Sequence, residues 1–541
     1  MPYPKYNWAR NKRTVINVIK RVSPVRVRIE SIHLKNFKGV SEGDIVFNCK
    51  NNPFEKDIMS DILGIYGQNG SGKSSVLEAI RLSMAVMTGE VLSADKYAGL
   101  ISQGSDSARI EIVFQFTNPD ESIYRVGYAF SIAYKELPID KGMLNVRNEM
   151  AHSGSKFAST ALIALLAPMP ISAIMLAADV QAKKKKTGLP KTVKMLVVED
   201  EVLSLSGEFC GTDYRLAPIF DTRSEEVAFL PKAKHADFFP KNTASVIRDL
   251  ERLKLRAKYS STSFIFSYDV VRLIKEQFSQ DGDTDFNWLI VDMMTHAYNH
   301  VKVLDSIIVG ASRDQMIPIY TAAGEVSVRL NDSIAVVDED KLEILKTGID
   351  GINTILKELI PGLSLSAVEQ ADIDSSEATM NQASAEKKVK VYSVRGNTKI
   401  ELIQESTGIL HLISALGLLC YAFSNPCVTV AIDEIDAGIY EYLLGEILLI
   451  FEEYGRGQLI FTCHNLRPME VLNRKFVCFT TTNPNNRYLK LKNIRKEKNL
   501  REAYLSEIIA CNQDEELYSS AKHGKIAAAL QKAGEIIGQE T

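Results

Sequence analysis

The stretch Gly67-Gln68-Asn69-Gly70-Ser71-Gly72-Lys73-Ser74 decides the fold class of this chain. It matches the pattern GxxxxGK followed by Ser or Thr, and it stands between a short apolar run, 62–66, and a segment of helical periodicity, 74–87. In this strand, loop and helix order, the glycines let backbone N–H groups turn toward phosphates, and the helix N-terminus adds its dipole. Lys73 then reaches the terminal phosphates, and the Ser74 hydroxyl coordinates Mg²⁺. The sequence therefore predicts a nucleotide-binding α/β protein.

Two further apolar runs end in polar residues that suit the same chemistry. The run Val428–Ile432 leads directly to Asp433 and Glu434. Because ligands bind at the carboxyl ends of strands in open α/β sheets, this pair would lie beside the phosphate loop. Asp433 would hold Mg²⁺, and Glu434 would polarise an attacking water. The run Gln458–Thr462 leads to His464, for which we expect a γ-phosphate contact.

These motifs resemble the ABC-type ATPase head of the SMC, RecF, RecN and OLD proteins. The resemblance covers about residues 26–135 and 388–515. It implies an α/β P-loop NTPase with a mixed or parallel sheet and flanking helices, and it implies ATP and Mg²⁺ as ligands. The implied organisation is a basic N-terminal arm (1–25), the N-terminal half of the head (26–139), a mainly helical insertion for dimerisation or partner binding (140–387), the C-terminal half (388–515) and a helical tail (516–541).

The resemblance also assigns roles to individual residues. In the family, a turn like Asn36-Phe37-Lys38 touches the nucleotide, a glutamine like Gln103 senses Mg²⁺ and the attacking water, and Asp436-Ala437-Gly438 corresponds to the D-loop. The implied ATP ligands are Asn36, Lys38, Gly67, Gln68, Asn69, Gly70, Ser71, Gly72, Lys73, Ser74 and Ser75. The implied Mg²⁺ ligands are Ser74, Asp433 and Gln103, and the implied catalytic residues are Glu434, His464 and Gln103.

The family signature Leu-Ser-Gly-Gly-Gln is altered here to Glu405-Ser406-Thr407-Gly408-Ile409. Ser406 and Gly408 remain, so a hydroxyl and a helix N-terminus could meet the γ-phosphate from the opposite subunit. We therefore expect a homodimer or higher oligomer in which two heads enclose two ATP molecules. The altered signature resembles that of bacterial ATPases labelled AAA15 or AAA21 in phage-defence operons, such as PtuA of Septu and retron-linked systems.

Two function classes follow from this resemblance. In the first, the chain is the regulatory or sensor ATPase of an antiphage complex, with a separately encoded effector such as an HNH nuclease, and with DNA or a reverse-transcribed nucleic acid as a further partner. In the second, it is a DNA repair or recombination ATPase, like RecF or RecN, that clamps DNA. About 75 residues follow His464, too few for the Toprim nuclease of the OLD branch, so we do not expect an intrinsic nuclease. An effector site within 140–387 is a third alternative.

Charge and residue composition limit the classes of partner that this chain is expected to bind. The 541 residues carry 64 Lys and Arg against 67 Asp and Glu, a net charge of -3, so no whole-molecule attraction to nucleic acid or membrane is expected. Residues 1–28 nevertheless hold eight basic residues and no acid, which suits phosphate contact, an acidic partner or a solvated tail. The uncharged stretch 157–178 contains two prolines, and we interpret it as a helix pair rather than a membrane span. Seven cysteines without a CxxC pair favour a reduced, cytoplasmic setting.

Overall fold

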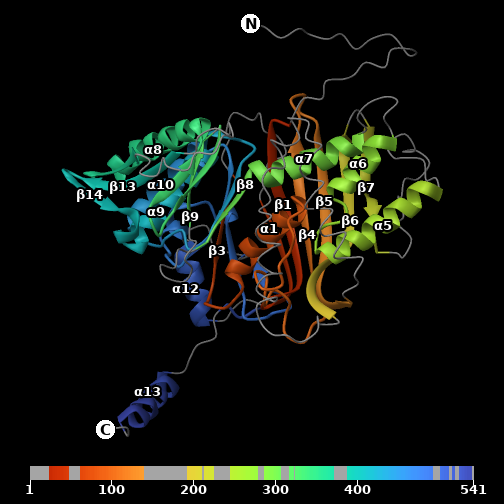
Figure 1. Cartoon of the computed structure of the whole chain (residues 1–541). Coiled ribbons are helices and arrows are strands. Elements are labelled where there is room, and N and C mark those ends of the chain that lie inside the picture. The colour runs from red at the N-terminus through yellow and green to blue at the C-terminus, as the bar shows by residue number, and fades with distance from the viewer. Residues whose placement is uncertain are drawn as a thin grey trace, which may run out of the picture.

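The computed structural model (Figure 1) describes residues 24–47, 61–138, 192–209, 212–223, 244–277, 285–305, 316–321, 323–370, 387–490, 500–510, 515–517 and 523–538. Residues 1–23, which form most of the expected basic arm, and the stretch 157–178 lie outside the described residues.

A mostly parallel sheet forms the centre of the head. Its apolar strands are buried on both faces, which is typical of parallel sheets covered on each side. The two-residue strand at one edge pairs antiparallel with its neighbour, and all other pairs in this sheet are parallel. The order is β18 (Tyr488–Leu489), β17 (Val477–Thr480), β3 (Asp61–Tyr66), β16 (Gln458–Thr462), β15 (Thr429–Ile432) and β8 (Val301–Leu304).

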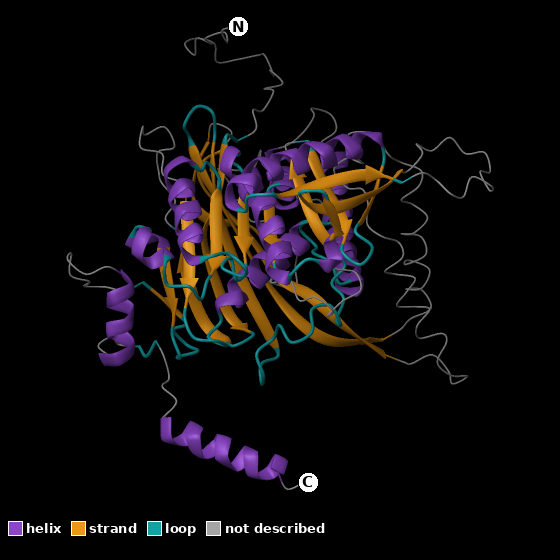
Figure 2. Cartoon of the chain, turned by 90° about the vertical axis from the view of Figure 1, so that its left-hand side faces the viewer, coloured by secondary structure: helices purple, strands orange, loops and turns teal. Residues whose placement is uncertain are grey.

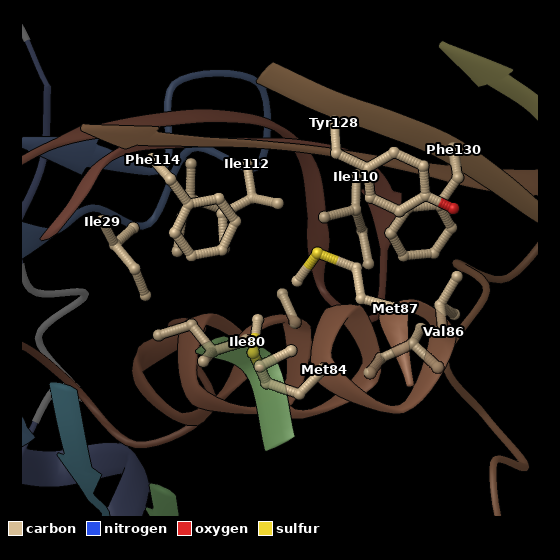
Figure 3. Packing of buried hydrophobic residues seen from close by; sticks show 14 of the residues in the cluster. Ile29, Ile80, Met84, Val86, Met87, Ile110, Ile112, Phe114, Tyr128 and Phe130 are labelled. Atoms are coloured by element: carbon tan, nitrogen blue, oxygen red, sulfur yellow. The ribbon is translucent and has the colours of Figure 1, made fainter. Parts of the chain in front are cut away.

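A second, antiparallel sheet lies across helix α1 (Lys73–Met87) from the first. Figure 3 shows the apolar side chains of α1 packed against those of this sheet, among them Met87 near Ile110 and Tyr128. Because α1 has apolar layers on both sides, it is buried almost all round. The order of the antiparallel sheet is β2 (Val40–Val46), β1 (Arg26–Phe37), β4 (Ser107–Thr117), β5 (Ile123–Pro138), β6 (Thr192–Phe209) and β7 (Thr212–Asp221).

A third sheet, also antiparallel, carries the second hydrophobic core together with helices α8 (Glu339–Leu359) and α9 (Thr407–Ser424). Among the described helices, α9 alone has the length and apolar composition of a membrane span, and most of its residues are buried inside this core. The sheet order is β12 (Leu363–Glu369), β13 (Lys387–Arg395), β11 (Ile334–Val337), β10 (Gly324–Arg329) and β9 (Met316–Thr321), with β14 (Thr398–Glu401) paired to β13.

The remaining helices lie around these sheets, except the C-terminal helix α13, which stands apart from them (Figure 2). They are α5 (Ala244–Ser260), α6 (Tyr268–Gln277), α7 (Asp285–Asn299), α10 (Glu441–Tyr454), α11 (Pro468–Val471), α12 (Leu500–Ala510) and α13 (His523–Gly538).

The insertion at 140–387, expected to be mainly helical, contains strands as well as helices in its described part: β6–β12 accompany the helices α5–α8. β6 and β7 extend the antiparallel sheet of the first half, β8 joins the central parallel sheet, and β9–β12 build most of the third sheet. The run 288–304 shows helical periodicity throughout, but α7 ends at Asn299 and Val301–Leu304 pairs in parallel with β15. Short apolar runs do not distinguish helix from strand by themselves, and here pairing with a distant strand decides.

Two of the eight basic residues within 1–28 have a structural role. Arg26 and Arg28 lie buried on β1, and both form ion pairs with Oδ2 of Asp61, the first residue of β3, with Arg26 Nη2 at 2.6 Å. Arg28 also donates to the carbonyl oxygens of Pro426 and Arg456. These two arginines therefore connect the antiparallel sheet to the parallel sheet, and they are not part of an exposed basic surface.

Candidate nucleotide-binding site

The phosphate loop follows the buried strand β3 directly. Gly67 has φ +152, and a Cβ on it would lie 1.8 Å from the Thr480 hydroxyl oxygen of β17, so no side chain fits at this position. The Ser71 hydroxyl donates to the Gln68 carbonyl at 2.5 Å and closes the turn. Strand, loop and helix α1 therefore form the arrangement that the sequence predicted, with the loop at the carboxyl end of the central strand.

Lys73 bends back over this loop. Its Nζ donates to the carbonyl oxygens of Gly67 at 2.8 Å and Gln68 at 3.2 Å, and the residue is 7% exposed. Burial lowers the pKa of Lys73, while the nearby carboxylates of Asp433 and Glu434 act in the opposite direction. Phosphate oxygens at this position would supply a closer countercharge to the ammonium.

A chain of hydrogen bonds links α1 to the ends of β15 and β16. The Ser74 hydroxyl donates to Asp433 Oδ1 at 3.1 Å, and the Thr462 hydroxyl donates to the same oxygen at 2.5 Å. Thr462 Oγ1 in turn accepts from the Glu434 backbone N–H at 2.8 Å. Glu434 has φ +49, a conformation that is uncommon for residues other than glycine and is concentrated at functional sites. Both acidic residues are thus fixed at the strand end.

This donor set fits Mg²⁺. The Ser74 hydroxyl and the Asp433 carboxylate meet at hydrogen-bond distance, so one cation could contact both oxygens. Within the described part of the chain, no group of three or more His, Cys, Asp or Glu side chains could hold a metal ion. Ser74 and Asp433 would contribute two oxygen ligands, and phosphate and water would be needed for the octahedral shell that Mg²⁺ prefers.

A cavity of about 430 Å³ opens over these residues, within the size range of ligand sites. It brings together residues from both halves of the head, and most of the predicted site residues line it. The lining consists of Lys38, Gly39, Asn69, Gly70, Gly72, Lys73, Ser74, Ser75, Asp433, Glu434, Thr462 and His464.

The turn at 36–38 lies at the cavity edge and is held by the following loop. Asn36 and Lys38 both have φ +53, and the Lys38 side chain forms an ion pair with Glu78 of α1. The Ser102 hydroxyl donates to the Lys38 carbonyl at 2.6 Å, and Ser102 N donates to the Asn36 carbonyl at 2.9 Å. Gln103 is the next residue; it is exposed and does not line the cavity. Its contact with Mg²⁺ stays a prediction.

Asp436 positions the loop that carries His464. Its carboxylate accepts from the backbone N–H of His464 at 3.2 Å and of Asn465 at 2.9 Å. The side chain of His464 lines the cavity and is exposed. Asp436 therefore anchors the His464 loop within its own chain.

The signature residues stand at the start of α9. Ser406 is the N-cap, and its hydroxyl accepts from Ile409 N at 3.3 Å. Ser406 is exposed, and neither it nor Gly408 lines the cavity of its own chain.

The sequence reasoning missed three side chains that support the site. Thr462 bridges the two acidic residues, as described above. The Tyr488 hydroxyl donates to the Gly72 carbonyl at 2.8 Å, and Arg487 donates to the Gly39 carbonyl at 2.5 Å. Thr462 is the last residue of a predicted strand beside the acidic pair, so it could have been found from the pattern, whereas nothing local marks the other two.

The fold and the cavity define a P-loop nucleotide-binding protein of mixed α/β architecture. The family described as "RecF/RecN/SMC N terminal domain" matches residues 28–486, and the chain belongs to this family. The predicted fold class, an ABC-type ATPase head, is thereby confirmed, and the family implies ATP as the nucleotide.

Individual relatives match less completely. A segment of 98 residues is 31% identical to "Chromosome partition protein Smc" of Methanocaldococcus jannaschii; it covers 18% of this chain and only 7% of that protein. Among solved structures, the chain is similar to the SmcHead bound to the C-winged helix domain of ScpA (TM-score 0.38, 13% identity, 88% of this chain and 99% of that one). It is also similar to RecF-ATP in the RecFOR pathway (TM-score 0.29, 11% identity, 81% and 93%).

Proposed function

We propose that this protein binds and hydrolyses ATP as a dimer of heads. The observation that carries the proposal is the hydrogen-bonded chain Ser74–Asp433–Thr462–Glu434 at the floor of the cavity, directly beside Lys73. This chain of hydrogen bonds connects the predicted Mg²⁺ ligands, Ser74 and Asp433, to the predicted base, Glu434. Ser74 belongs to the N-terminal half of the head, and the other residues belong to the C-terminal half.

The charged and polar residues around the phosphate loop have separate tasks in the proposed reaction. Lys73 and the loop N–H groups bind the β- and γ-phosphates, and Ser74 with Asp433 holds Mg²⁺, which when bound neutralises phosphate charge. Glu434 orients the attacking water and accepts its proton, and His464 contacts the γ-phosphate. The protein's main contribution is to hold these groups in position before ATP arrives.

The dimer follows from the position of the signature residues. Ser406 is exposed at the N-terminus of an 18-residue helix, outside the cavity of its own chain. A helix N-terminus favours a nearby anion, so the partner's γ-phosphate is a suitable ligand. ATP binding would then close two heads on two nucleotides, and hydrolysis would release them.

The substitution Glu434→Gln tests this function. We expect hydrolysis to fall by about 100-fold or more, because the base is lost. ATP should remain bound, and light scattering after gel filtration should show stronger self-association with ATP than without it. Glu441→Gln, at an exposed position on α10, is the matched control and should hydrolyse ATP normally. Unchanged hydrolysis by Glu434→Gln would reject the assignment.

We further propose that the ATPase serves as the cytoplasmic regulatory subunit of an antiphage complex with a separately encoded nuclease. The altered signature supports this role, because it resembles that of the phage-defence ATPases labelled AAA15 or AAA21. The alternative is a repair ATPase that clamps DNA. Purification with the products of neighbouring genes, with and without ATP, tests the two: a co-eluting nuclease supports the first, and repair proteins or DNA support the second.

A further inference from the structure

Helix α13 lies apart from the rest of the chain, beyond α12 in Figure 1, and the rotated view of Figure 2 shows the same separation. Its side chains from 524 to 536 are all exposed. They include Ile526, Leu530 and Ile536, which are 47%, 69% and 62% exposed. An isolated helix of 16 residues is marginal in water, and its stability comes mainly from packing an apolar face. This helix therefore requires a partner surface.

The spacing of apolar and basic residues on α13 indicates which residues the partner surface must carry. Ile526, Leu530 and Ala533 follow each other at i, i+4 and i+7, which puts them on one face of the helix. Lys525 and Lys532, seven residues apart, lie together on one flank of that face, and both are exposed. A matching partner would carry an apolar stripe of the same spacing with acidic residues beside it.

Helix α10 carries such a stripe. Leu443, Ile447, Ile450 and Tyr454 follow each other at i, i+4, i+7 and i+11. Ile450 and Tyr454 are 49% and 61% exposed, and the other two are half-buried. The neighbouring face of α10 is buried in the second core through Leu444, Leu448 and Phe451, and Leu443 and Ile447 pack partly against the same core. The stripe is thus a surface on a rigid element.

The charges beside the two stripes are opposite. Glu446 and Glu453 of α10 are exposed, are seven residues apart and flank the stripe. The 14 residues of α10 contain four Glu and no Lys or Arg. Because Lys525 and Lys532 have the same spacing of seven, both acid–base pairs can form in one register, as charges that flank a coiled-coil seam do.

We propose that α13 of one chain packs on the α10 stripe of a second copy of this chain. Within its own chain α13 is exposed, and Figure 1 shows α12 between it and α10. The five residues 518–522 that connect Leu517 to α13 span at most about 20 Å, which keeps the helix close to the position of Leu517 in the second core. Reciprocal exchange of two α13 helices produces a dimer that needs no nucleotide.

Mass measurements on the full chain in nucleotide-free buffer test the contact. We expect wild type to form a species of twice the 60.2 kDa chain mass. Leu530→Asp and Ile450→Asp should each raise the dimer dissociation constant by about tenfold or more, because each puts a charge into the seam. Gln531→Asp, on the polar face of α13, is the control and should leave the dissociation constant unchanged. A monomeric wild type, or full-strength dimers of both seam variants, would overturn the proposal.

A charge exchange distinguishes a second copy from the same chain. One variant carries Lys525→Glu and Lys532→Glu, and the other carries Glu446→Lys and Glu453→Lys. Each alone should dimerise weakly, because like charges face each other. An equimolar mixture should recover wild-type dimerisation, since each α13 then meets an α10 of opposite charge in the other chain. If α13 packed on its own α10, mixing would recover nothing, and the proposal would be rejected. The assay contains no ATP, so its result is independent of the proposed hydrolysis.

Discussion

Gly408 and Gly438 lie against each other through their backbones. A Cβ on Gly438 would stand 2.2 Å from the Gly408 Cα, and a Cβ on Gly408 would stand 2.7 Å from the Gly438 Cα. The first residue belongs to the opening turn of α9, where the signature stands, and the second closes the D-loop. Through Asp436 the D-loop also holds the backbone of the His464 loop. The signature that would contact the partner's ATP is therefore packed directly on the loop that shapes the cavity of its own chain.

Gly438→Ala should push the D-loop away from the first turn of α9. Alanine at φ +76 is strained by about 1–2 kcal/mol, and its methyl group would in addition displace Gly408. We expect a lower melting temperature and an ATPase rate that falls by about tenfold. Gly396→Ala is the matched control, because Gly396 also has positive φ, +57, but open space around it. If both variants lose the same amount of activity, the glycine contact has no role in coupling.

The parts of the site that are local in sequence could be predicted, and the parts that depend on distant pairing could not. The phosphate loop and its helix are one continuous segment, and Asp433 and Glu434 directly follow an apolar run, so pattern and spacing were sufficient. Tyr488 reaches the Gly72 carbonyl from 416 positions away, and no periodicity marks it.

The strands of the insertion could not be predicted for the same physical reason. β6 pairs with β5 over almost its whole length, and β8 pairs with β15 across more than a hundred residues. Whether an apolar run becomes a strand there depends on a partner that the local sequence does not contain.

Thr462→Val tests the bridge between the two acidic residues. Valine has a similar shape but no hydroxyl, so Asp433 loses a donor and the Glu434 N–H loses its acceptor. We expect kcat to fall by about tenfold and the Mg²⁺ concentration for half-maximal activity to rise, because an unsatisfied buried group costs about 1–3 kcal/mol. Thr462→Ser keeps the hydroxyl and should retain most activity. Equal losses in both variants, measured by steady-state kinetics over a Mg²⁺ titration, would contradict this role.

Asp61→Asn tests the ion pairs that join the two sheets. The substitution removes the carboxylate that both Arg26 and Arg28 contact, and it leaves two buried guanidinium groups without this countercharge. Loss of one partner of a buried ion pair costs about 3–5 kcal/mol, so the urea midpoint should drop strongly. Asp305→Asn removes the partner of Arg81 at a much more exposed site and should change the midpoint little. A similar small shift in both variants would show that the buried pairs do not stabilise the fold.

His296 gives the fold a defined acid sensitivity. Its ring is 4% exposed, lies edge-on to Phe114 and Phe116, and has no hydrogen-bond partner for either nitrogen among the described residues. Burial lowers the pKa of His296 well below its usual 6.5, and His300 and Arg28 add to the effect. As pH falls through 6.5, the unfolded chain takes up a proton that the folded chain does not, so stability decreases.

The size of this effect can be measured with a single variant. Between pH 6.5 and 5 one such histidine removes at most about 1.5 kcal/mol of the free energy of unfolding. His296→Leu, which cannot titrate, should reduce the loss of stability over that window by this amount, as read from urea unfolding at several pH values. His33→Leu, which replaces a histidine paired with Asp44 near the surface, serves as the control. An unchanged pH slope in His296→Leu would mean that the ring is protonated in the folded protein, which contradicts its burial without a partner.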